Sequence, residues 1–162
     1  MLVPNATDGV VIRAGVVPDD IELCAEIWVR ALEARDGTVD ADAMAQRVRS
    51  AFGNLIVRFA VATSPQSGFA LVESGRPDPT EALLHFVAVH PGGPGRGVGT
   101  ALIADAAGKA KLGGFDSLVL EVRTSNVRAI SLYTRFGFLP FGAELAHPLT
   151  GHPMQPYRLA LG

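Results

Sequence analysis

A glycine-rich loop joins an apolar strand to a helix in the middle of the chain, and this order limits the possible folds. Residues 82–89 form a mostly apolar run that is typical of a buried strand. A loop with five glycines follows over residues 90–100. A helix is expected over about 97–112 and a second strand over 117–122. Such a strand–helix–strand crossover joins parallel neighbours, so at least two strands of the sheet should be parallel.

The flanking segments predict antiparallel strands and three more helices. Pro18-Asp19-Asp20 indicates a helix start, with an acidic side chain able to accept bonds from free amides, and Asp36-Gly37 indicates its end. A mixed α/β (α+β) domain is therefore predicted, with a largely antiparallel sheet of six to seven strands and four helices. The remaining expected strands are 9–13, 55–62, 69–73, 138–143 and 156–161, and the remaining helices are 21–36, 40–52 and 127–135.

Composition narrows the function classes. The formal net charge of the 162 residues is −2, which gives no global electrostatic case for binding nucleic acid or an anionic membrane. No apolar run approaches the roughly 20 residues of a membrane span. The N-terminal residues lack the pattern of a signal peptide, and Cys24 has no partner for an internal disulfide. A cytosolic protein is expected.

The loop is suited to bind a phosphate. A helix start offers free backbone N–H groups and a favourable dipole, and glycines let the backbone approach an anion closely. Arg96 adds a positive charge. A plain flexible connector is the alternative. A P-loop of the Walker type is excluded because Gly99, not lysine, precedes Thr100. A dinucleotide fingerprint lacks its third glycine, and the antiparallel hairpins argue against it, although Glu121 lies roughly where its ribose-binding acid would.

Two segments resemble signatures of one family, the GNAT superfamily of N-acetyltransferases. The first is Val-Ala-Val-His-Pro at 87–91 followed by Gly-Arg-Gly-Val-Gly at 95–99. The second runs from Leu120 to Phe138 and is most similar to the branch that acetylates the N-terminal alanine of a ribosomal protein. The resemblance covers 86–138 closely and the rest only in element order. It implies one N-acetyltransferase domain over 1–162, with an acyl-CoA-binding core at about 82–138.

The resemblance implies a role for each matching residue, with acetyl-CoA as the cosubstrate. The strand at 87–89 would diverge from its neighbour in a splayed central pair and offer its backbone to the pantetheine arm. The loop amides would hold the pyrophosphate, Tyr133 would lie beside the sulfur, and Glu121 matches the general base of the ribosomal-protein branch. The implied cofactor-binding residues are Val87, Ala88, Val89, Gly95, Arg96, Gly97, Val98, Gly99, Thr100, Asn126 and Tyr133.

One position departs from the family pattern. Pro94 stands where the family usually has glutamine or arginine, and proline offers neither an N–H nor a polar side chain. The loop is therefore expected to hold its ligand through the remaining amides and Arg96, with lower affinity.

The predicted catalytic residues also have structural interpretations. Tyr133 can donate a proton to a leaving thiolate, but it also lies on an apolar helical stripe with Ala129 and Phe136. Glu121 interrupts a strand that is expected to be covered on both faces, where a carboxylate needs a partner or a function. A salt bridge to Arg123 or Arg128 is its structural alternative.

The other polar candidates have structural alternatives too. His85 competes with Glu121 as the base, Asn126 also suits a helix N-cap, and Cys24 fits the core better than a nucleophile. Direct transfer in a ternary complex is then expected. His147 and His152 lack the further ligands that a metal site needs.

The acceptor amine is the least determined part. The connection at residues 33–42 should form part of its site, and either a small amine or a protein or peptide amino group fits. A non-catalytic acyl-CoA sensor is the alternative class of function. A homodimer is left open.

Overall fold

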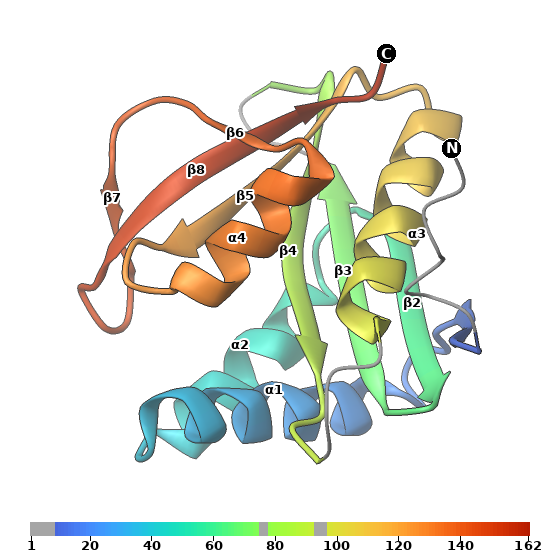
Figure 1. Ribbon diagram of the computed structural model, residues 1–162. Helices are drawn as coiled ribbons and strands as arrows, with labels where there is room; N and C mark the ends of the chain where they lie inside the picture. Colours follow the sequence, from blue (N-terminus) through green and yellow to red (C-terminus); the bar gives the residue numbers. More distant parts are fainter. Residues whose placement is uncertain (1–8, 75–77, 93–96) are drawn as a thin grey trace.

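One twisted sheet forms the centre of the computed structural model, which describes residues 9–74, 78–92 and 97–162 (Figure 1). Within these residues the sheet has eight strands in the order β1-β2-β3-β4-β5-β8-β6, with β7 paired to β8. The strands are β1 (Val11–Ala14), β2 (Ile56–Ser64), β3 (Gly68–Ser74), β4 (Glu81–Val89), β5 (Ser117–Arg123), β6 (Leu139–Pro140), β7 (Leu145–Ala146) and β8 (Pro153–Ala160).

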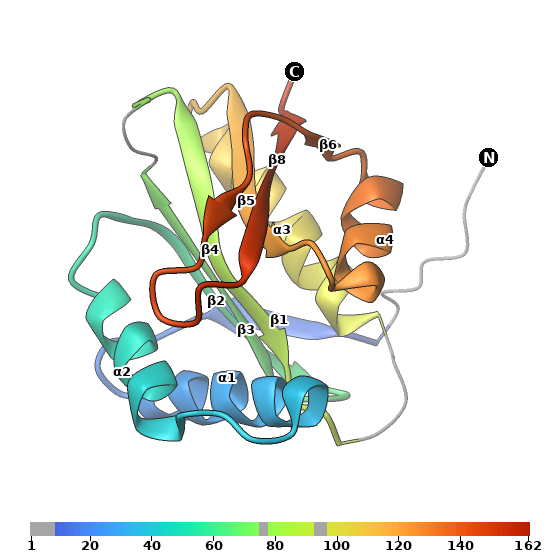
Figure 2. The same ribbon diagram turned by 90° about the vertical axis from the view of Figure 1, so that its left-hand side faces the viewer.

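Helices cover both faces of the sheet. The helices are α1 (Ile21–Asp36), α2 (Ala41–Ala51), α3 (Val98–Leu112) and α4 (Val127–Phe136). Figure 2 shows α1 and α2 on one side of the sheet and α3 and α4 on the other. Each side has its own apolar core, one built around Phe69 and Phe86 under α1 and α2, the other around Leu102 and Phe138 under α3 and α4.

Short polar contacts fix the helix ends. The Asp40 carboxylate accepts a hydrogen bond from the Ala43 N–H (3.0 Å) and caps α2, which offsets part of the cost of unpaired amides. The expectation of a similar acidic cap on α1 is wrong. The Asp20 carboxylate instead accepts bonds from the Arg13 guanidinium (2.7 and 2.9 Å) and the Val16 N–H (2.7 Å), so it ties α1 to β1.

A bulge in β4 changes which side chains face each helix layer. Leu71 pairs with Phe86 and Val72 with Leu84, so His85 is an extra residue on β4. Leu84 belongs to the core under α3, whereas Phe86 belongs to the core under α1 and α2. The bulge therefore sets the orientation of the second half of β4, including Val87 and Ala88.

The parallel pairing between β4 and β5 is short. It joins Glu81–Leu83 to Ser117–Val119 and extends no further, while β5 stays paired with β8 over its whole length. The two strands then diverge, as Figure 1 shows where their arrows point apart. The predicted splayed central pair is confirmed.

The predicted fold class is confirmed, with corrections in the last third. The four helices and the largely antiparallel sheet are as expected, but the predicted strand 138–143 shrinks to the two-residue β6, and the equally short β7 was not predicted. The dinucleotide-binding alternative is wrong, because only β4 and β5 pair in parallel among the strands described. No helix in the described part of the chain is long and apolar enough to cross a membrane.

Candidate active site

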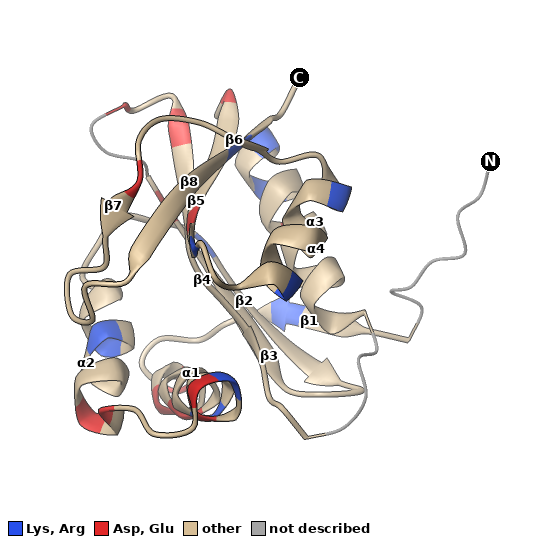
Figure 3. Ribbon diagram, turned by 60° about the vertical axis from the view of Figure 1, so that its left-hand side comes forward, with Lys and Arg blue, Asp and Glu red and all other residues tan. Residues whose placement is uncertain are grey.

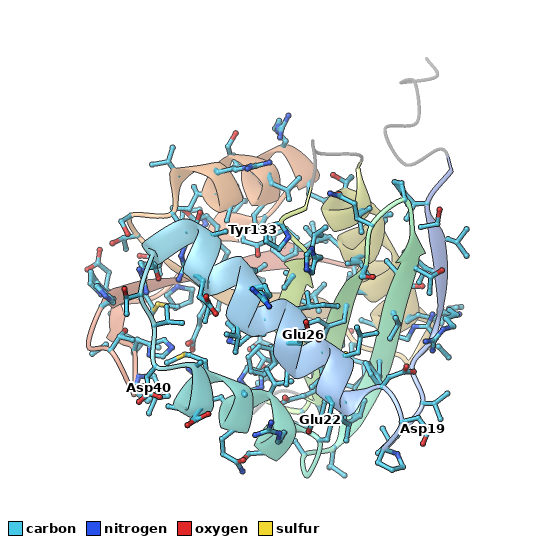
Figure 4. The ribbon with its side chains drawn as sticks, turned by 90° about the horizontal axis from the view of Figure 1, so that it is seen from below. Asp19, Glu22, Glu26, Asp40 and Tyr133 are labelled. Atoms are coloured by element: carbon cyan, nitrogen blue, oxygen red, sulfur yellow. The ribbon has the colours of Figure 1, made fainter. Side chains whose placement is uncertain are left out.

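A cavity of about 810 Å³ opens where β4 and β5 diverge. Its walls come from the diverging strands, from α1, α2 and their connection, from α4, and from the segment between β7 and β8. Figure 4 looks at the molecule from the side of α1 and α2, with Tyr133 between α1 and α4 and Asp40 at the start of α2. The residues that line it include Trp28, Arg35, Asp36, Val87, Ala88, Glu121, Arg123, Asn126, Tyr133, His147, Leu149 and His152.

Tyr133 reaches this cavity from the inner face of α4. Its ring packs edge-on against Phe138, with centroids 5.7 Å apart, and only 9% of the residue is exposed. Burial raises the pKa of Tyr133 to about 12, so the hydroxyl is protonated at neutral pH. Tyr133 therefore packs in the core and also lines the cavity, and the two interpretations made from the sequence are compatible.

Glu121 also lines the cavity, but the expected burial of its side chain is wrong. The residue is exposed, because the core under α1 and α2 does not extend over β5 and the cavity lies there instead. The proposed salt bridge is also wrong. No oxygen of Glu121 lies within 4 Å of Arg123 or Arg128, and Arg123 donates to Asp36 instead (3.1 Å). The Glu121 carboxylate is thus available to a ligand in the cavity.

His85, the competing base, lies elsewhere. The bulge directs its ring to a second, more open cavity of about 500 Å³, lined also by Arg47 and Leu149. There the His85 Nδ1 lies 2.5 Å from the Glu73 carboxylate, which also accepts a hydrogen bond from the Asn54 amide (3.1 Å). The structure therefore places Glu121, and not His85, on the cavity that Tyr133 lines.

The start of α3 offers unpaired backbone donors. The first intrahelical bond runs from the Ala101 N–H to the Gly97 carbonyl (2.9 Å), so the N–H groups of residues 98–100 precede the helical ladder. No acidic side chain lies in this first turn. Gly97 has a φ of 76°, which favours glycine. The predicted loop residues Gly95 and Arg96, and the departing Pro94, lie outside the described residues.

Asn126 is the expected N-cap of α4, and its cofactor contact stays a prediction. Its side-chain oxygen accepts a hydrogen bond from the Ala129 N–H (3.2 Å) and caps α4, and the residue also lines the cavity. Cys24, in contrast, is fully buried in the core under α1, where burial raises the pKa of its thiol to about 12. The core interpretation of Cys24 is confirmed, since such a thiol is neither accessible nor ionised.

Several cavity residues were not predicted from the sequence. The indole N–H of Trp28 is buried without a hydrogen-bond acceptor among the described residues. His147 and His152, considered only as metal ligands, line the cavity, and Arg47 of α2 contacts His147. Acidic and basic segments lie side by side here on α1, α2 and β5 (Figure 3). No sequence spacing indicates these contacts, because α2 and the segment after β7 are about one hundred residues apart.

His147 is held as a neutral ring. Burial is the main cause that lowers the pKa of His147 to about 4, and the nearby Arg47 and Arg123 add to it. Its Nδ1 accepts hydrogen bonds from the N–H groups of Leu149 (3.1 Å) and Thr150 (3.2 Å). Its Nε2 lies 2.5 Å from the Arg47 guanidinium.

Comparison with known proteins identifies the family. The chain belongs to the acetyltransferase (GNAT) family, whose family model matches residues 24–138. The crystal structure of the ribosomal-protein-S18-alanine N-acetyltransferase of Escherichia coli has the same fold, with a TM-score of 0.73, 24% identity and 94% of each chain covered.

Two curated relatives are longer proteins. An uncharacterized protein of Mycobacterium leprae is 30% identical over 127 residues, which are 78% of this chain and 34% of the relative. Mycothiol acetyltransferase of Frankia casuarinae is 35% identical over 72 residues, 42% of this chain and 21% of the relative. The chain thus spans about a third or less of the length of these relatives.

The state of His147 leads to a testable prediction. A ring whose pKa falls from its ordinary 6.5 to about 4 stays neutral until the pH drops well below 6. In an NMR titration, the His147 ring signals should change with a midpoint near pH 4. Arg47→Met should raise that midpoint, because it removes a nearby positive charge. A wild-type midpoint near 6.5 would contradict the environment described for this ring.

Proposed function

We propose that this protein is an N-acetyltransferase that moves the acetyl group of acetyl-CoA to a primary amine by direct attack in a ternary complex. The observation that carries the proposal is the gap between β4 and β5, where unpaired strand backbone, Tyr133 and Glu121 meet at one cavity. Members of this family use acetyl-CoA as their cosubstrate.

The cofactor would lie between the start of α3 and the cavity. The free N–H groups of Val98, Gly99 and Thr100 suit the pyrophosphate, because a helix start combines unpaired donors with a favourable dipole. Gly95, Arg96 and Gly97 would complete that cradle. The pantetheine arm would then follow β4 beside the backbone of Val87, Ala88 and Val89, with Asn126 on the opposite wall.

Transfer needs one bond made and one broken. The amine nitrogen attacks the thioester carbonyl carbon, the carbon–sulfur bond breaks, and the amine loses one proton. Tyr133 is a weaker acid than free tyrosine, since its pKa is about 12. Its main contribution is a hydrogen bond to the charge that develops on sulfur, and this bond is stronger in a site of low polarity. The proton released by the amine balances the one that the departing CoA thiol takes up.

Glu121 is the proposed proton acceptor, directly or through one water. It lines the same cavity as Tyr133, and neither Arg123 nor Arg128 pairs with it. An α-amino group, with a reference pKa near 8, needs less help from such a base than a lysine side chain near 10.4. Cys24 cannot carry the acetyl group because it is buried, which favours direct transfer.

Both classes of acceptor remain candidates at this level. The E. coli structure is that of an enzyme named for the alanine of a ribosomal protein, and the Frankia relative is named for mycothiol. The cavity extends from Tyr133 to α1 and the segment after β7, and the acceptor would enter there.

Tyr133→Phe tests the role of the hydroxyl. The substitution keeps the ring against Phe138 but removes the hydrogen bond to sulfur, so kcat should fall by about 10²-fold or more. The dissociation constant for acetyl-CoA, measured by calorimetry, should stay close to wild type. Unchanged kcat would remove Tyr133 from the mechanism. If wild-type protein binds acetyl-CoA but releases no CoA with any amine or peptide, the sensor alternative holds.

Gly99→Val tests the cofactor loop. A side chain here meets no protein atom closer than 3.8 Å at its Cβ, so the fold should tolerate it, but it would stand beside the amides proposed to hold the pyrophosphate. The dissociation constant for CoA should rise by about tenfold or more, which corresponds to a loss of about 1.4 kcal/mol of binding free energy. Gly108→Val in the same helix is the matched control, because its Cβ also meets open space. Equal affinities in the two variants would mean that this helix start does not bind CoA.

A further inference from the structure

We propose that the acceptor is an amine that carries its own carboxylate, as a free amino acid does, and that Arg47 and His147 bind this carboxylate. The inference rests on the proposed function and names the acceptor class for the same site. It starts from Arg47, whose guanidinium is partly buried and has no carboxylate partner among the described residues.

Arg47 is unusual among the arginines described. Three of them are partly buried: Arg47, Arg58 and Arg123. Arg58 pairs with Asp105 (2.9 Å) and Arg123 with Asp36 (3.1 Å). Arg47 has no carboxylate within 4 Å among the described residues. Its guanidinium is nevertheless desolvated, and this burial lowers its pKa. A desolvated guanidinium stays charged and is costly without a partner, so its position favours an anionic ligand.

The neighbouring His147 has more donors around it than it can satisfy. A neutral imidazole has one lone pair and one N–H. Its Nδ1 accepts from two backbone N–H groups, which places the ring proton on Nε2. The Nε2–H then points at the Arg47 guanidinium, which can only donate. The two nitrogens lie 2.5 Å apart, so no atom fits between them. A ligand oxygen beside this contact would accept from the remaining N–H groups of Arg47 and, once the contact widens, from the Nε2–H.

The charge balance favours a carboxylate over a phosphate. Arg47 supplies one positive charge, and His147 is neutral at pH 7. Arg35 and Arg123 already share Asp36, so they are not free to balance a second negative charge. The Glu121 carboxylate is close enough to act on Arg47 electrostatically, and it would repel a dianion more than a monoanion.

The phosphates of the cofactor are not an alternative partner. Arg47 lies on α2, which packs chiefly on α1, whereas the proposed pyrophosphate site is at the start of α3 on the other face of the sheet. Arg47 instead borders the second cavity, next to Leu149, which lines both cavities. The carboxylate would therefore bind at the acceptor end of the site.

An amino acid would span this arrangement. Its carboxylate would lie beside the contact of Arg47 with His147, and its amine would lie toward Glu121 and the thioester beside Tyr133. An amino acid amide or an internal peptide segment has no negative charge where the carboxylate would lie, so it leaves Arg47 without a counterion. The inferred preference is thus for acids over their amides.

Binding of product-type probes tests the inference without any turnover. The N-acetyl derivatives of alanine, leucine, serine and lysine, and the amide of each, are titrated into the protein by calorimetry. At least one acid should bind about tenfold or more tightly than its amide, because a hydrogen bond to a charged group is lost in the amide. Arg47→Met should abolish that difference, and His147→Phe should reduce it.

Arg49→Met is the matched control. Arg49 lies two residues further along α2 and pairs with Glu22 at the surface, so its loss should leave the preference intact. Circular dichroism of each variant shows that it is folded. Equal binding of acids and amides, or a preference that survives Arg47→Met, overturns the inference.

CoA release with free amino acids and with their amides separates the two proposals. If acids bind selectively but no amine releases CoA, the proposed function fails and the carboxylate site stands. If amides release CoA as fast as acids and Arg47→Met changes neither rate, the function stands and the carboxylate site is wrong.

Discussion

The early end of the pairing between β4 and β5 determines where every proposed group of this site lies. Three residues of each strand pair in parallel, and beyond them β5 keeps only its pairing with β8. Strand backbone without a partner needs another hydrogen-bonding group or water. The gap therefore creates both a cavity and a row of available backbone groups. Tyr133 reaches that cavity from α4, which follows directly after β5, and Glu121 reaches it from β5 itself.

A second irregularity of β4, in its pairing with β3, acts beside this divergence. The bulge at His85 turns the second half of β4, so that Phe86 and Ala88 support the core under α1 and α2. The same bulge sends His85 to a different cavity, where Glu73 holds it. Glu121 is exposed because the cavity, and not a packed helix, lies over this side of β5. The divergence and the bulge thus place Glu121 and His85 on different cavities.

Local sequence patterns predicted the elements and the class of the site, but not its acceptor end. Apolar periodicity and the glycine loop were sufficient for the four helices and the central crossover, and the resemblance located Tyr133, Asn126 and the splay. The burial of Glu121 was mispredicted because an apolar strand is expected to be covered on both faces. The sequence does not show that a cavity lies over one face of β5. Asp20 was expected to cap α1, since sequence spacing cannot reveal that Arg13 competes for it. The contact between Arg47 and His147 joins segments one hundred residues apart, and no periodicity reports such a pair.

The central claim is that the gap between β4 and β5 is the place where the thioester meets the amine. A crystal structure of the protein with bound CoA tests this most directly. The account predicts that the pantetheine arm follows Val87–Val89, with the sulfur in hydrogen-bonding distance of the Tyr133 hydroxyl. The pyrophosphate should lie on the amides at the start of α3. A CoA molecule bound outside the gap, or with its sulfur remote from both Tyr133 and Glu121, would contradict it.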